Sequence, residues 1–159
     1  MKKGIFAVLI VIWMAFIFSM SSQNSEVSSN TSRETIKVVL SVIPNFIEHP
    51  EEVQEKVVEE LQYITRKSAH FIAYMILGIL AILLFLQYEN INKKPQLAFL
   101  LCVVYAISDE VHQLFVPGRS GQVSDIIIDS SGSFVGIVVV LLCVKLLAIK
   151  KQKRGIKSL

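Results

Sequence analysis

Four long apolar runs alternate with polar segments along this chain of 159 residues. The runs are Gly4–Met20, Phe71–Leu86, Leu97–Ile107 and Ile126–Ile149. A helix needs about 20 residues to cross a hydrocarbon core of about 30 Å. The first and third runs are shorter, but polar neighbours can extend them. The pattern predicts an all-α integral membrane protein with four transmembrane helices. Their expected bounds are about 4–22, 68–88, 97–116 and 125–149.

The composition agrees with one membrane domain over residues 1–159. Hydrophobic residues make up 53% of the chain, which is more than an ordinary soluble domain contains. Cys102 and Cys143 lie within apolar runs, which is typical of small core residues and not of a disulfide framework or metal site. We therefore expect no cofactor and no bound metal.

Basic residues mark one side of the predicted membrane. They precede the first run, lie between the second and third runs, and end the chain as Lys145, Lys150, Lys151, Lys153, Arg154 and Lys157. The positive-inside rule places both termini and the 88–96 loop in the cytoplasm. Residues 21–65 and the 117–124 loop then lie outside. The basic tail is explained by this topology and by anionic lipid, so nucleic acid is not an expected partner.

The first run has a second interpretation, as a signal peptide. No A-x-A-like site follows Met20, so we expect a retained helix. Beyond it, the extracytoplasmic segment 23–66 is expected to hold two short amphipathic helices after a loosely ordered linker over Ser21–Ser32. One covers Glu34–Ile43, and the other starts near Pro50 and continues into the membrane. Both are expected to lie on the outer membrane surface or to cap the bundle.

Ionisable residues gather at the predicted outer ends of the helices. The second helix enters the membrane with Arg66, Lys67, His70 and Tyr74. Residues three or four apart share a helix face, so these four side chains can point the same way. Snorkelling of the two cations toward lipid phosphate and a bundle hydrogen bond for His70 are the alternatives.

The third helix must continue to about Val116 to span. Asp109 and Glu110 then lie roughly 10 Å below its outer end, and each shares a face with Gln113. Carboxylates at that depth need cations or hydrogen-bond donors, or they take up protons. His112 is expected to face elsewhere.

A Pro117-Gly118 turn should end the third helix and place Arg119 near the membrane surface. The fourth helix is expected to start with Ser124 or Asp125 as its cap, and Asp129 follows one turn later. Gly132 and Gly136 are typical of close helix packing. Three helix ends therefore meet in one polar cluster, which could be a binding site or an internal network of salt bridges.

Three motifs in this region resemble the VanZ-like family. They are R-K-S-A-H-F-x-x-Y at 66–74, D-E-x-H-Q-x-F-x-P-G-R at 109–119 and D-x-x-x-D-x-x-G-x-x-x-G at 125–136. The resemblance covers about Arg66 to Gly136. It implies a bacterial multi-pass membrane protein at the cell envelope that contributes to teicoplanin tolerance, but it implies no reaction. The family's polar positions fall on Arg66, Lys67, His70, Glu110, Gln113, Arg119 and Asp125. Asp129 stands where the family often has Asn.

The favoured hypothesis is a site for an anionic lipid-linked or cell-wall headgroup in the outer leaflet. Arg66, Lys67 and Arg119 would hold its phosphate or carboxylate. Glu110 and His70 would be the candidates for proton transfer, and Asp125 would orient Arg119 or His70. Tyr74, Asp109, Gln113 and Asp129 complete the predicted binding set.

Other functions stay open at this point. One is a membrane-embedded hydrolase or transferase acting on such a headgroup, including a metal-dependent form with His70, Glu110 and Asp125 as ligands. Another is a non-catalytic envelope scaffold. A transporter is disfavoured, because four helices show no internal repeat. The sequence does not determine the oligomeric state.

Overall fold

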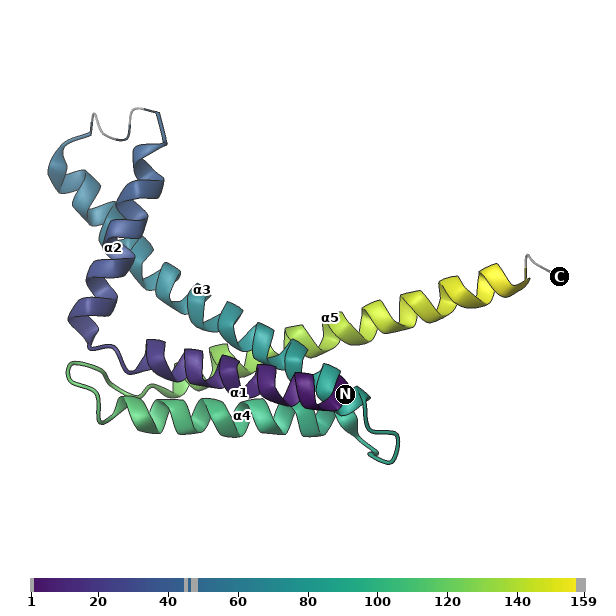
Figure 1. The fold of residues 1–159 in the computed structure, drawn as a ribbon. Coiled ribbons are helices and arrows are strands. Elements are labelled where there is room, and N and C mark those ends of the chain that lie inside the picture. The colour runs from purple at the N-terminus through teal and green to yellow at the C-terminus, as the bar shows by residue number, and fades with distance from the viewer. Residues whose placement is uncertain (1, 45, 47–48, 157–159) are drawn as a thin grey trace.

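The computed structural model describes residues 2–44, 46 and 49–156, and over these residues it contains five α-helices and no strand. The helices are α1 (Lys2–Ser21), α2 (Ser25–Ser41), α3 (Glu51–Leu86), α4 (Lys94–Gln113) and α5 (Val123–Ile156) (Figure 1). The all-α prediction is therefore confirmed.

Helix α3 is the centre of the bundle, because it contacts each of the other four helices. The described ends of α1 and α5 nearest the two termini lie on the same side of the bundle, and the loop between α4 and α5 lies on the opposite side (Figure 1). Helix α3 is continuous over its 36 residues, which confirms that the segment starting near Pro50 runs directly into the second apolar run. Its first half projects from the bundle as a hairpin with α2.

Glycines allow α3 and α5 to pack backbone against backbone. A Cβ on Gly132 would lie 2.2 Å from the carbonyl oxygen of Phe71, and a Cβ on Gly136 would lie 2.2 Å from that of Met75. Gly78 is its counterpart on α3, since a Cβ there would lie 2.3 Å from the carbonyl oxygen of Ser133. The predicted close approach at Gly132 and Gly136 is confirmed.

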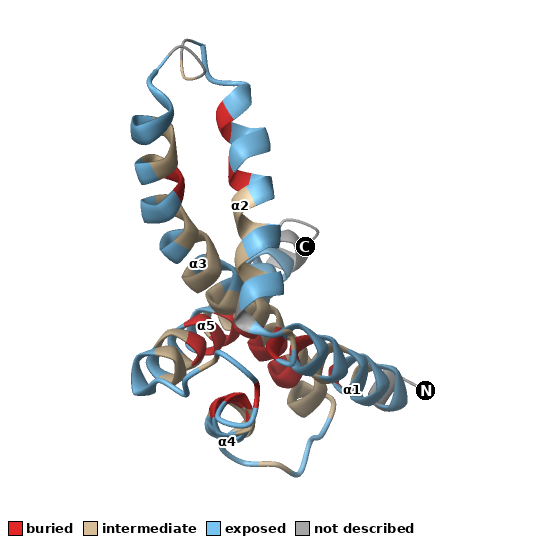
Figure 2. Ribbon diagram, turned by 90° about the vertical axis from the view of Figure 1, so that its left-hand side faces the viewer, coloured by how far each residue is buried: buried red, intermediate tan, exposed pale blue. Residues whose placement is uncertain are grey.

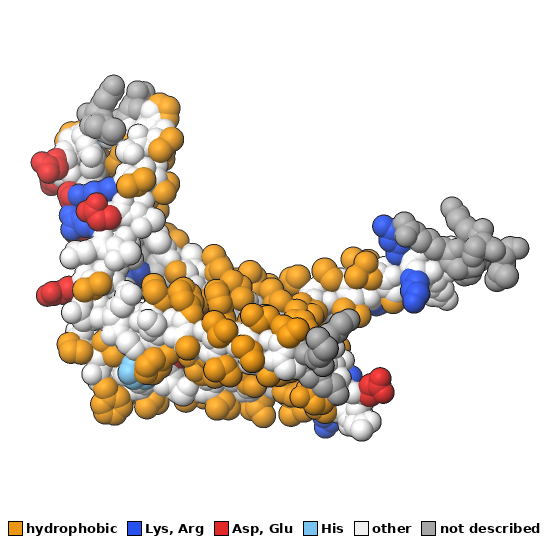
Figure 3. All heavy atoms as spheres, viewed as in Figure 1, with side chains coloured by type: hydrophobic (Ala, Val, Ile, Leu, Met, Phe, Trp, Pro, Cys, Tyr) orange, Lys and Arg blue, Asp and Glu red, His pale blue; other side chains and the backbone are white. Residues whose placement is uncertain are grey.

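The surface of the bundle is apolar. Three helices, α1, α3 and α5, each contain a stretch long and apolar enough to cross a membrane. Helix α4 falls outside this group, because its polar termini lower its average hydropathy. Apolar side chains cover the bundle between the charged hairpin and the charged end of α5 (Figure 3). This surface is that of a membrane protein.

Helix α2 is longer than predicted. It begins at Ser25, where a loosely ordered linker was expected. Asn24 caps it, since its Oδ1 accepts a hydrogen bond from the backbone N–H of Val27 at 2.9 Å. The side-chain Nε2 of Gln62 on α3 donates to the carbonyl oxygen of Ser29 at 2.8 Å. Capping and docking on α3 thus outweigh the weak helix propensity of the serines and asparagines.

The hairpin of α2 and α3 has a small core of its own. Ile36, Leu40 and Val58 form one buried cluster, and Figure 2 shows buried positions on the facing sides of the two helices. Glu55 on α3 forms ion pairs with Arg33 and Lys37 of α2. The hairpin is therefore held by apolar packing and by exposed charges.

Three further predicted details are wrong. Helix α4 ends at Gln113 and not near Val116, although its 20 residues still cover about 30 Å. Helix α5 begins at Val123, so the expected caps Ser124 and Asp125 lie in its first turn. Cys143 is exposed, whereas Cys102 is buried in the core as predicted.

Candidate functional site

All five helices and the loop between α4 and α5 contribute residues to the end of the bundle opposite the termini. The indole N–H of Trp13 donates to the carbonyl oxygen of Ala73 at 2.8 Å, and the hydroxyl of Tyr105 donates to that of Met14 at 2.6 Å. These two bonds fix α1 against α3 and α4. The polar end of α1 is thereby held beside the charged residues of the other helices.

Lys67 and Asp125 form an ion pair that joins α3 to α5. Their side chains are only 17% and 14% exposed, so water screens the pair weakly. Asp125 thus pairs with Lys67, and not with Arg119 or His70 as predicted. Of the three cations at this end of the bundle, Arg66, Lys67 and Arg119, only Lys67 takes part in this pair.

Glu110 fastens the loop between α4 and α5. Its Oε2 accepts a hydrogen bond from the backbone N–H of Gln122 at 2.8 Å, and its Oε1 accepts one from the Gln113 amide at 3.4 Å. The loop passes so close that a Cβ on Gly121 would lie 2.8 Å from the Glu110 carbonyl oxygen. Both carboxylate oxygens of Glu110 are therefore engaged, Oε2 with the loop and Oε1 with Gln113 of its own helix.

The loop turns where the sequence predicts it. The backbone N–H of Arg119 donates to the carbonyl oxygen of Val116 at 3.1 Å, and Gly118 has a φ of 73°. A positive φ after proline is the signature of a type II turn. The turn brings Arg119 back to the bundle, where its Nε donates to the Gln23 carbonyl oxygen at 3.1 Å.

Arg66 and Arg119 are the two cations at this site without a carboxylate partner among the described residues. Burial lowers the pKa of the Arg119 guanidinium, and the positive charge of Arg66 lowers it further. An arginine remains charged despite such shifts. Within the described part of the chain, the site therefore carries two positive charges that no ion pair neutralises.

Two adjoining cavities share these arginines. One of about 320 Å³ is polar, with Gln62, Tyr63, Ser120 and Gln122 among its lining residues. The other, of about 220 Å³, is mainly apolar and is lined by residues such as Phe16, Ile17, Met20 and Ala73. Arg66, His70 and Arg119 line both cavities. The cationic residues thus stand where a polar chamber meets an apolar one.

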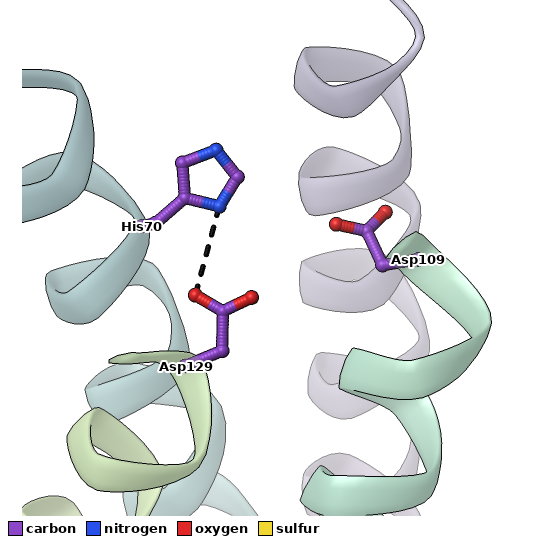
Figure 4. A group of neighbouring side chains, drawn as sticks. All are labelled: His70, Asp109 and Asp129. Carbon is purple, nitrogen blue, oxygen red and sulfur yellow. Dashed lines mark ion pairs between the residues drawn. The ribbon is translucent and has the colours of Figure 1, made fainter. Parts of the chain in front are cut away.

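Buried acids lie behind His70. The Nδ1 of His70 is 3.6 Å from the Oδ1 of Asp129, and Asp109 points toward the same space from α4 (Figure 4). Asp109 and Asp129 are 2% and 0% exposed. The carboxylate oxygens of Asp109 and Asp129 have no hydrogen-bond partner among the described residues. The same holds for the buried hydroxyl of Tyr74.

The predicted site residues therefore separate into four groups. Six line the polar cavity: Arg66, Lys67, His70, Gln113, Arg119 and Asp125. Tyr74 lines the apolar cavity, Asp109 and Asp129 are buried beside His70, and Glu110 lines neither cavity. His112 faces elsewhere as predicted, since its Nε2 lies 3.0 Å from Ser22 Oγ.

Sequence reasoning missed the contribution of α1. Ser21 is buried at its end, Gln23 binds Arg119, and Phe16 and Ile17 line the apolar cavity. The signal was the sudden change from an apolar run to S-S-Q-N, which was interpreted only as the start of a linker. Nothing in the sequence indicated which helix would lie beside it.

Comparison with known proteins gives one match. The family model for VanZ/LLP1 matches residues 6–144, which includes all of the cavity-lining residues above. No similar curated protein and no similar solved structure was found.

Proposed function

The chain belongs to the VanZ/LLP1 family, and from this premise we propose that it binds an anionic lipid-linked or cell-wall headgroup at the outer face of the bacterial cell membrane. The family's name and the apolar helices support a membrane protein linked to teicoplanin resistance. The proposal adds a ligand class and a site for it.

The proposed topology has four membrane-spanning helices, including α4, and both termini in the cytoplasm. It rests on the basic residues at the chain ends and in the 88–96 loop. Helix α4 joins α1, α3 and α5 in the apolar bundle, so a membrane that covers those three also covers α4. The polar cavity then opens outward, and the α2–α3 hairpin caps the bundle or lies along the membrane surface.

One observation carries the ligand assignment: the polar and apolar cavities meet at two arginines that have no carboxylate partner among the described residues. An amphiphile with an anionic headgroup matches this arrangement, because its headgroup would fill the polar chamber and its chain the apolar one. Arginine suits phosphate or carboxylate, since its planar guanidinium can donate two parallel hydrogen bonds. A salt-bridge network that merely closed the bundle would place acids against these arginines.

The surrounding residues take distinct roles in this proposal. Lys67 and Asp125 hold α3 and α5 at the rim of the cavity, and Gln113 offers an amide to the headgroup. Tyr74 shapes the apolar chamber. Glu110 positions the loop that carries Arg119. A non-catalytic envelope scaffold would use the same fold without any need for free arginines.

A hydrolase or transferase acting on the bound headgroup is the second candidate. The observation that favours it is the position of His70, which lines both cavities and pairs with Asp129 behind it. A histidine oriented by a carboxylate can accept or donate a proton at its other nitrogen. Glu110 was the second predicted proton-transfer residue, and its engagement with the loop makes it a positioning residue in this account.

The test compares envelope lipids and cell-wall precursors from cells that express wild type, Arg119→Ala or His70→Gln at equal membrane levels. A species altered by wild type and restored in both variants would indicate turnover of that species. Unchanged species with teicoplanin tolerance lost in both correctly inserted variants would indicate binding alone. Full tolerance in both variants would refute the assignment of the site.

A further inference from the structure

Three ligand-type side chains from three different helices converge behind the polar cavity. They are His70 of α3, Asp109 of α4 and Asp129 of α5, and each offers one ligand atom within 4.8 Å of the other two (Figure 4). The metal-dependent alternative considered from the sequence used His70 with Glu110 and Asp125, whereas the structure brings Asp109 and Asp129 to His70 instead. Only the packing of the three helices brings these residues together.

The charges of this cluster can be balanced by a bound cation. Two carboxylates are almost fully buried, and their oxygens have no hydrogen-bond partner among the described residues. A buried charge needs a partner, a coordinated ion or a proton. Lys67, the nearest lysine in the sequence, is already paired with Asp125, and Arg119 donates its Nε to Gln23. One divalent cation would neutralise both Asp109 and Asp129.

We propose that His70, Asp109 and Asp129 bind a divalent transition-metal ion of the Zn²⁺ or Mn²⁺ type. Imidazole nitrogen favours transition metals over Mg²⁺ or Ca²⁺, and carboxylate oxygens suit Zn²⁺ and Mn²⁺. Metal–ligand distances of about 2.0–2.2 Å place ligand atoms about 3–4 Å apart. The 3.6 Å between His70 Nδ1 and Asp129 Oδ1 is in this range, and small side-chain rotations would bring in Asp109.

The site would be open on one side. His70 is 22% exposed and lines both cavities, whereas the two acids close the inner side. Three protein ligands with a free position toward a cavity are typical of metal sites that also bind an exogenous ligand. The hydroxyl of Tyr74, one turn from His70, is a buried donor for which the described residues provide no hydrogen-bond partner.

A proton-only cluster is the competing explanation. His70 would carry a proton and pair with Asp129, while Asp109 would be protonated and neutral. This arrangement also has no net charge, so it is distinguished from a metal site only by measuring bound metal. The inference does not depend on the proposed headgroup binding, because the metal can be measured without any ligand.

The experiment uses the purified full-length protein in detergent, stripped with EDTA and then titrated with Mn²⁺. Free Mn²⁺ is followed by electron paramagnetic resonance, and Zn²⁺ is used as a competitor. We expect one equivalent to bind. Since loss of even an outer-shell partner weakens metal binding about 10–100-fold, Asp109→Asn and Asp129→Asn should each bind at least about tenfold more weakly. Glu89→Gln, which changes an exposed carboxylate in the loop between α3 and α4, is the matched control and should bind as wild type does.

A second readout keeps the test decisive if an aspartate variant does not fold. Electron spin-echo modulation from imidazole nitrogen should be present with Mn²⁺ bound to wild type and to His112→Gln. It should be absent in His70→Gln. The proposal fails if the folded wild type binds neither Mn²⁺ nor Zn²⁺ stoichiometrically. It also fails if the nitrogen signal survives in His70→Gln, or if Asp129→Asn binds as tightly as wild type.

Discussion

Substitution of Gly132 by alanine tests whether the approach of α3 and α5 positions the site. The added Cβ would lie 2.2 Å from the carbonyl oxygen of Phe71 and 3.0 Å from its carbonyl carbon. Both are backbone atoms, so no rotamer change can relieve the clash. Carbon contacts are comfortable near 3.5–4.0 Å, so the two helices must separate by about 1 Å.

The expected loss of stability follows from two opposing terms. Overpacking costs about 1–3 kcal/mol, and the upper end applies because the clash is with backbone. Alanine gains about 1 kcal/mol over glycine in a helix interior. The net destabilisation is therefore about 2 kcal/mol, which for a chain of this size lowers the melting temperature by roughly 4–8 °C.

The assay is thermal unfolding in detergent, followed by the fluorescence of Trp13, the only tryptophan in the chain. Its indole N–H bonds to Ala73 of α3, so the signal reports on the bundle. Gly4→Ala is the matched control, since nothing lies within 4 Å of a Cβ there, and it should melt at or above the wild-type temperature. If Gly132→Ala melts no lower than Gly4→Ala, the close approach does not hold the bundle together.

Two further predictions concern the contacts of the site. Lys67→Met and Asp125→Asn should each lower the free energy of unfolding by about 1–3 kcal/mol, because each leaves a partly buried group without its partner. The double variant should lose less than the sum of the two, and strictly additive losses would show that the residues do not interact. Glu110→Gln should speed hydrogen exchange at the Gln122 amide, because a neutral acceptor holds that N–H less tightly than a carboxylate. An unchanged exchange rate, measured by nuclear magnetic resonance, would contradict the loop-fastening role of Glu110.

The sequence predicted the parts of this structure that depend on local pattern. Apolar runs located α1, α3 and α5, and a spacing of four residues correctly placed Arg66 and His70 together on the cavity side of α3. Pro117-Gly118 located the turn. These features depend on hydrogen bonding and side-chain geometry within a few residues of each other.

The features that the sequence did not predict depend on how the helices are rotated against each other. Periodicity cannot tell whether Asp125 meets Lys67 or Arg119, because both choices place opposite charges together. Nor can it show that Asp109 and Asp129 meet behind His70, since that requires three helix axes to be fixed. Helix α2 was shortened because serine and asparagine have weak helix propensity, and its cap and docking partner were not recognised.

The central claim is that Arg66 and Arg119 hold an anionic headgroup, and lipid retention tests it most directly. Purified protein is incubated with phosphatidic acid or with diacylglycerol of the same chain length, and bound lipid is counted by native mass spectrometry. We predict that wild type retains phosphatidic acid in preference to diacylglycerol. The preference should persist in Arg33→Gln, which alters the hairpin outside the cavities, and disappear in the double variant Arg66→Gln/Arg119→Gln. Equal retention of the two lipids by wild type, or an undiminished preference in the double variant, would contradict the account.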